Sequence, residues 1–121
     1  MFNATHVRHN HLVPRATIGD PNGVKVGIID SGVDYKHHHL GGCFGTGCFV
    51  SHGYDFVGDA YTGRNKPVPD SDPMDECNGH GTHVAGLSIS GLGRMGIRSL
   101  GAYRVLGCAG STSLIILTQA M

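Results

Sequence analysis

The sequence is poor in charge, and it lacks tryptophan, basic clusters and long apolar runs. Charged residues make up 15% of its 121 residues, against about 25% in a typical soluble domain. With 40% hydrophobic residues it does not have the composition of a disordered chain. Nine Lys and Arg balance nine Asp and Glu, so no basic surface for nucleic acid is expected. No stretch approaches the roughly 18 apolar residues that a membrane span needs. Neither nucleic acid nor membrane is therefore an expected partner.

An apolar leader is also missing from the start of the sequence. Residues 1–15 are mixed and rich in histidine, without the apolar centre of a signal peptide. The length suits one small domain with a modest core. We divide the chain into a lead-in at residues 1–23, a main unit at 24–113 and a tail at 114–121.

Glycine, by contrast, is abundant, and the 20 glycines predict many tight turns. Residues 24–30 form a nearly continuous apolar run, which is typical of a strand buried on both faces of a parallel sheet. Residues 100–106 are a second strand candidate, and residues 55–57 a short one. A helix is expected from His80 until Gly91 and Gly93 end it, and another near Ser113. This alternation predicts an α/β fold with a parallel sheet.

Two short motifs carry candidate chemistry. Asp30-Ser31-Gly32 ends the first expected strand, at the edge where functional groups of parallel sheets gather. On its own this motif is equally well an ordinary turn. The second motif places His80 between two glycines at the start of a helix, where the imidazole could act as a base if a carboxylate fixed its tautomer. A single histidine is more often structural, but the composition of residues 78–86 favours a functional one.

These motifs carry a resemblance to a known family. Residues 26–33 resemble the aspartate motif of subtilisin-like serine proteases, and residues 80–86, His-Gly-Thr-His-Val-Ala-Gly, match their histidine motif. The order Asp then His also suits the family's Asp, His, Ser order. Residues 41–58 and 101–105 resemble fungal secreted members in particular.

The resemblance implies a fold and a set of roles. It implies a partial three-layer subtilisin-like domain, α/β with a parallel sheet, truncated after the second or third core strand. Asp30 would orient and stabilise the imidazole, and His80 would be general base and then acid. His83 would be structural and pack inside the helix.

The resemblance further implies a protein or peptide substrate laid beside the strand at residues 100–106. Gly107, Gly110 and Ser111 would border its groove and bind the peptide by main-chain hydrogen bonds. We expect no cofactor, an extracellular location and, if the chain folds, a monomer.

Four cysteines permit three disulfide pairings, which the spacing alone leaves open. Zinc would need paired short spacings, and only Cys43 and Cys48 lie close together. In the family's fold the positions of Cys77 and Cys108 are near one another, so the resemblance implies a Cys77–Cys108 disulfide and leaves Cys43–Cys48.

No metal site is expected. His37, His38 and His39 would point in alternating directions from an extended segment and so could not easily share an ion. A calcium ligand of many family members would fall at His39, so the resemblance does not support calcium there. Residues 70–76, although acidic, are interpreted as a solvated loop with a minor chance of calcium contact.

The family's serine has no counterpart here. None of the eight serines lies in a Gly-Thr-Ser-Met-Ala setting, and the asparagine of the oxyanion hole would fall beyond Met121. We therefore expect these residues to be the truncated front of a catalytic domain that folds poorly alone. The irregular residues 87–99 and the tail suggest a shifted reading frame or a wrongly placed intron, with true divergence as the alternative. Two functions stay open: a serine endopeptidase by family, or an inactive fragment or pseudoenzyme.

Overall fold

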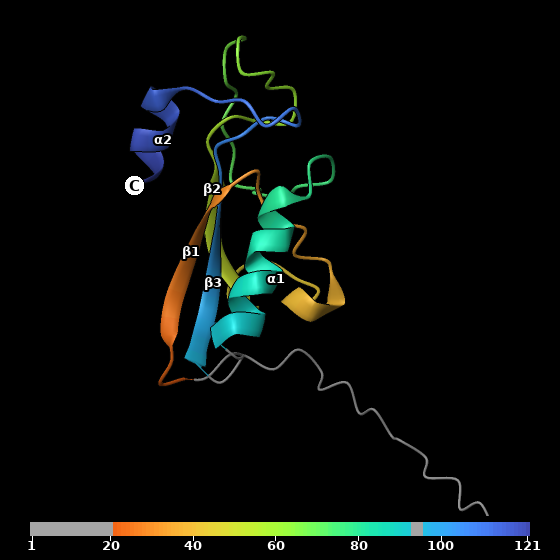
Figure 1. Ribbon diagram of the computed structural model, residues 1–121, viewed down its shortest axis with the longest axis vertical. Coiled ribbons are helices and arrows are strands. Elements are labelled where there is room, and N and C mark those ends of the chain that lie inside the picture. Colours follow the sequence, from red (N-terminus) through yellow and green to blue (C-terminus); the bar gives the residue numbers. More distant parts are fainter. Residues whose placement is uncertain (1–20, 93–95) are drawn as a thin grey trace, which may run out of the picture.

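The computed structural model describes residues 21–92 and 96–121, which form a parallel sheet with a helix packed on one face. The strands are β1 (Val24–Asp30), β2 (Val50–Asp55) and β3 (Ile97–Arg104), in the order β1-β3-β2. Helix α1 (His80–Leu92) lies against the sheet, and α2 (Leu114–Ala120) lies beyond its carboxyl edge (Figure 1). A short 3₁₀ helix, η1 (His38–Leu40), follows β1. The predicted α/β class with a parallel sheet is confirmed.

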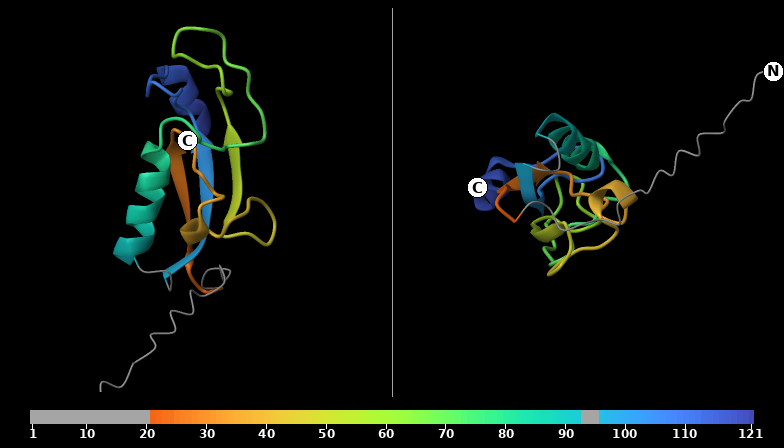
Figure 2. Two further views of the ribbon diagram at one scale, coloured as in Figure 1. Left: turned by 90° about the vertical axis from the view of Figure 1, so that its right-hand side faces the viewer. Right: turned by 90° about the horizontal axis from the view of Figure 1, so that it is seen from below.

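The main core lies between the sheet and α1. Ile28 of β1 and Ala102 of β3 are paired in register, and both are buried with Val50 of β2 and Ala85 of α1. Because side chains alternate along a strand, these residues share the sheet face that α1 covers. Figure 2 shows α1 on this one side of the sheet. A second, smaller cluster joins α2 to the loops through Ile116, Val57, Tyr61 and Val105.

Strand β1 is not buried on both faces, so that expectation was wrong. Val24 is 58% exposed and Ile29 is 39% exposed, and of the whole strand the structure buries only Ile28. The physical reason is its position: β1 is an edge strand, and within the described residues no helix covers the face that carries Ile29. The central strand is β3, which pairs on both sides and is buried almost throughout.

Several boundaries also differ from the predicted ones. The strand expected at residues 55–57 is β2 at Val50–Asp55, and β3 starts at Ile97, three residues early. Helix α1 ends at Leu92, between Gly91 and Gly93, which were expected to end it, and Gly93 lies outside the described residues. Helix α2 starts as predicted after Ser113, whose hydroxyl accepts a hydrogen bond from the backbone N–H of Ile116. No helix in the described ranges has the length and apolar character to cross a membrane.

Candidate functional site

The structure brings Asp30 and His80 together at the carboxyl edge of the sheet. Asp30 is the last residue of β1 and His80 the first of α1. Nδ1 of His80 lies 2.8 Å from both carboxylate oxygens of Asp30, and the backbone N–H of Ser31 donates to Oδ1 of Asp30 at 2.7 Å. The Asp30 side chain is 13% exposed, whereas that of His80 is 63% exposed. A sheltered carboxylate thus holds an accessible imidazole.

This geometry leaves one nitrogen of the imidazole for chemistry. When Nδ1 carries the proton that it donates to Asp30, Nε2 is unprotonated and can accept a proton from a nucleophile. The positive charge that then forms on His80 lies beside the carboxylate of Asp30, which stabilises it. The pair can therefore act as a general base and return the proton as a general acid.

Small and polar residues at the start of α1 hold His80 against β1. A Cβ on Gly81 would overlap the carbonyl oxygen of Gly32, so only glycine permits this approach. At the next residue, the hydroxyl of Thr82 accepts a hydrogen bond from the backbone N–H of Asp34 at 2.8 Å. The helix is thereby fixed to the loop that follows Asp30.

Replacing Gly81 by Ala is expected to lower the free energy of unfolding by about 1–3 kcal/mol or more, because two backbone segments would have to separate. Gly86 in the same helix is the matched control, since a Cβ there meets nothing within 4 Å. Gly86→Ala should raise stability by about 0.5–1 kcal/mol through helix propensity. Urea unfolding of the two variants measures both effects, and equal stabilities would contradict the packing described here.

Asp75 is a buried carboxylate beneath the pair, and the sequence reading missed it. It is 2% exposed, so the interpretation of residues 70–76 as a solvated loop was wrong at this position. Its Oδ2 accepts from the hydroxyl of Ser31 and the N–H of Gly79, both at 2.7 Å. Its Oδ1 accepts from the N–H groups of Cys77 and Asn78. Because water cannot reach this site, the four donors need an acceptor from the protein, and the inward turn of the loop places the Asp75 carboxylate there.

Burial alone would raise the pKa of Asp75, but the hydrogen bonds from Ser31, Asn78, Cys77 and Gly79 outweigh it, and the pKa lies below its ordinary value. The ionised carboxylate therefore stabilises the fold above the ordinary pKa of an aspartate. That contribution is lost as the pH falls through the lowered pKa.

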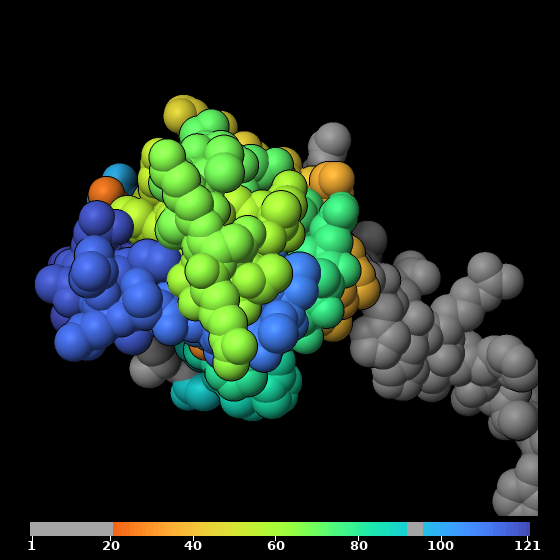
Figure 3. Space-filling model, turned by 90° about the horizontal axis from the view of Figure 1, so that it is seen from above, coloured from red at the N-terminus to blue at the C-terminus, as the bar shows by residue number. Residues whose placement is uncertain are grey.

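Both disulfides implied by the resemblance are present in the structure. Cys77 is joined to Cys108 with a Cα–Cα distance of 5.4 Å, and Cys43 to Cys48 with 5.6 Å. Beside the first bridge, the amide Nδ2 of Asn78 donates to the carbonyl of Cys108 at 2.9 Å. The loop before His80 is thus attached to the segment after β3. Figure 3 looks down on this edge and shows the two segments in contact.

Gly107, Gly110 and Ser111 follow β3 and form a turn. The N–H of Gly110 donates to the carbonyl of Gly107 at 2.9 Å, and the N–H of Gly107 donates to the carbonyl of Ser111 at 3.1 Å. These groups are already paired within the turn. The turn includes Cys108 and therefore lies next to the Cys77–Cys108 bridge. The role of the three residues in substrate binding stays a prediction.

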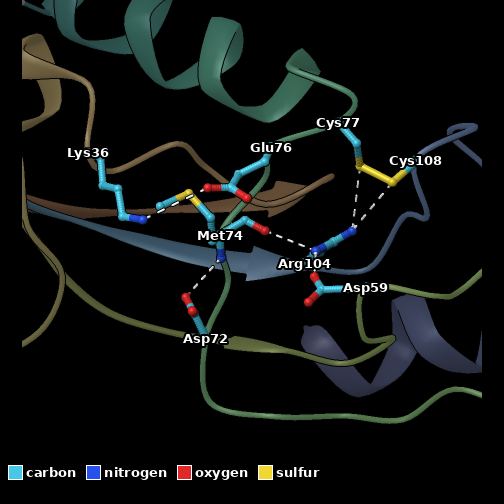
Figure 4. A pocket seen from close by; sticks show the side chains of 8 residues that line it. All are labelled: Lys36, Asp59, Asp72, Met74, Glu76, Cys77, Arg104 and Cys108. Atoms are coloured by element: carbon cyan, nitrogen blue, oxygen red, sulfur yellow. Dashed lines mark hydrogen bonds and ion pairs between the residues drawn. A yellow bond between two sulfur atoms is a disulfide. The ribbon is translucent and has the colours of Figure 1, made fainter.

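Arg104 is a second buried charge that sequence reasoning did not single out. It is 2% exposed at the end of β3 and donates to Asp59 at 2.7 Å and to the carbonyl of Met74 at 2.9 Å. These two bonds come from Nη1, whereas Nη2 lies 3.8 Å from the sulfur of Cys77 and 3.9 Å from that of Cys108 (Figure 4). The sequence signal that could have pointed to Arg104 is a charged residue within an otherwise apolar strand.

Burial raises the pKa of the Asp55 carboxyl, although hydrogen bonds from two backbone N–H groups and the charge of Arg104 act to lower it.

A cavity of about 430 Å³ opens beside Arg104 and the disulfide, lined by side chains of both charge signs. Figure 4 shows Lys36 and Glu76 facing one another across it, with Nζ and Oε1 3.9 Å apart. Since Lys36 and Arg104 are paired with carboxylates, the cavity has no unbalanced cationic surface. Its lining consists of Lys36, Asp59, Asp72, Met74, Glu76, Cys77, Arg104 and Cys108.

The histidine predictions need two corrections. His37, His38 and His39 are not extended, because they belong to or directly precede the 3₁₀ turn η1. Their ring centroids lie 4.0–5.2 Å apart, with the rings of His37 and His38 stacked and that of His39 tilted against both. His83 is exposed rather than packed inside, since α1 covers the sheet with its other face. Within residues 21–92 and 96–121, no group of three or more His, Cys, Asp or Glu residues is arranged to hold a metal ion.

An Asp-His pair at the carboxyl edge of a parallel sheet, in this chain order, has the arrangement expected for the acid–base half of a subtilisin-type site. The model of the subtilase family, Peptidase_S8, matches residues 21–120, and the chain belongs to this family. It is 45% identical over 92 residues to the minor extracellular protease Vpr of Bacillus subtilis, covering 74% of this chain and 11% of that protein. It is 36% identical over 131 aligned positions to subtilisin-like protease 6 of Arthroderma benhamiae, covering 92% of this chain and 27% of that protein.

A third relative, the alkaline serine exoprotease A of Vibrio alginolyticus, is 41% identical over 97 residues, which cover 78% of this chain and 15% of that protein. The chain thus spans about a tenth to a quarter of the length of these relatives. No solved structure matches it.

Proposed function

We propose that this chain supplies the Asp-His half of the catalytic triad of a serine endopeptidase. Asp30 fixes the imidazole of His80, and His80 removes the proton from a serine hydroxyl during attack on a peptide bond and then donates it to the leaving amine. The supporting observation is the pair of 2.8 Å contacts between His80 Nδ1 and the Asp30 carboxylate. Membership of the subtilase family supports the same reaction class.

The nucleophile in this proposal lies outside the 121 residues. Ser31, the serine beside Asp30, donates its hydroxyl to Asp75 at 2.7 Å and accepts from the N–H of Gly81. Its hydroxyl is therefore engaged away from the imidazole. That observation favours the second candidate function for the chain by itself, a peptide-binding fragment or pseudoenzyme without hydrolysis.

The proposed substrate is a protein or peptide that binds as an extended strand beside the turn at residues 107–111. We also propose an extracellular location. The name of one relative, an extracellular protease, supports it, and so do two disulfides, which persist in oxidising compartments.

The test uses a fluorophosphonate probe and casein with the full-length protein that contains this chain. Labelling and cleavage are expected, and His80→Ala should abolish both. His83→Ala is the matched control, since His83 lies on the same helix, exposed, and should leave them intact. Absence of labelling in the full-length protein, or its survival in His80→Ala, would refute the proposal. Labelling of the 121-residue chain itself would instead refute the location of the nucleophile.

A further inference from the structure

Asp75 stands apart from the other acidic residues because its carboxylate joins the two loops that carry the Asp-His pair. Through Oδ2 it reaches Ser31, the residue directly after Asp30. Through both oxygens it also accepts from the N–H groups of residues 77–79, directly before His80. One buried side chain therefore contacts both supports of the pair.

Ser31 completes the connection. Its backbone N–H donates to Oδ1 of Asp30 at 2.7 Å. Its hydroxyl donates to Asp75 and accepts from the N–H of Gly81, the residue after His80, at 3.0 Å. Ser31 is 1% exposed, so water does not replace these contacts. Asp30 and His80 are thus linked by a direct hydrogen bond and by a second path through Ser31 and Asp75.

We propose that Asp75 is a positioning residue, whose carboxylate sets the separation and orientation of Asp30 and His80 through Ser31 and the backbone of residues 77–79. A buried carboxylate with four donors has one low-energy position, and the loops must adapt to it. An amide in its place keeps one acceptor oxygen, but the donors on the other side then face an NH2 group that cannot accept, and the loop before His80 is free to move relative to β1. This inference rests on the proposed role of the pair, but its first test requires no protease activity.

The readout is the tautomer of His80, observed by correlating ring ¹⁵N and carbon-bound ¹H signals in the ¹⁵N-labelled full-length protein at a pH where the imidazole is neutral. His80→Ala identifies the signals. The wild-type ring is expected in the Nδ1–H form that donates to Asp30. In Asp75→Asn this form should fall from the main share to a minor one, because Asp30 no longer holds its position.

Asp72→Asn is the matched control. Asp72 lies in the same loop and accepts from the hydroxyl of Tyr35 and the N–H of Met74, so its replacement loosens the loop without touching the connections to the pair. It should lower stability and leave the tautomer of His80 unchanged. General destabilisation and loss of positioning are thereby distinguished.

Ser31→Ala is the second variant, and it decides the matter if Asp75→Asn does not fold. It removes the bridging hydroxyl but keeps the backbone donors on Asp75, so a smaller shift in the same direction is expected. An unchanged tautomer in the folded variants, or an equal shift in Asp72→Asn, would overturn the inference. A shifted tautomer together with an unlabelled full-length protein would refute the proposed function while the positioning role stands.

Discussion

On the proposed function, replacing Asp30 by Asn should lower kcat of the full-length protein by about 10⁴-fold while the fold survives. The amide has the shape of the carboxylate, but it can present an N–H to Nδ1 of His80. The imidazole would then carry its proton on Nε2, where it cannot accept one from the nucleophile. The two contacts of 2.8 Å make the tautomer of the His80 imidazole depend on Asp30.

Peptide hydrolysis at saturating substrate measures the effect, and circular dichroism checks the fold. Asp34→Asn is the matched control, because that carboxylate accepts from the N–H of Lys36 in the neighbouring turn and should not affect the rate. An Asp30→Asn protein that kept more than about a tenth of the wild-type kcat would show that Asp30 does not have the role assigned to it.

The sequence could predict Asp30 and His80 because each lies in a short motif that resembles the subtilisin-like family, and the resemblance implied that the two pair across 50 residues. Asp30 ends an apolar run, and His80 starts a helix among small residues whose size permits close approach. Such features follow from neighbouring residues. The same is true of the parallel sheet, which the alternation of strand and helix indicates.

What the sequence could not predict depends on distant contacts. The exposure of β1 follows from its place at the sheet edge, which its own residues do not encode. Asp75 looks like any acid in a polar loop until Ser31, 44 residues earlier, is placed beside it. Arg104 likewise becomes intelligible only when Asp59 and Met74 supply acceptors at the end of β3.

The two disulfides should differ in their effect on stability. Cys77→Ser/Cys108→Ser opens a loop with a sequence separation of 31, whereas Cys43→Ser/Cys48→Ser opens one of 5. The chain-entropy relation then predicts losses of about 4 and about 2 kcal/mol in the free energy of unfolding. Urea unfolding of both double variants in the full-length protein measures the difference, with each serving as the control for the other.

The larger loss should also be the one that reaches the site. The Cys77–Cys108 loop encloses α1 and β3 and ties the segment before His80 to the turn at residues 107–111. The Cys43–Cys48 loop precedes β2 and encloses no helix or strand. Opening the first should therefore reduce kcat as well as stability, and opening the second should reduce stability alone. Equal losses of stability, or a larger rate effect from Cys43→Ser/Cys48→Ser, would mean that the long bridge does not hold the two segments together.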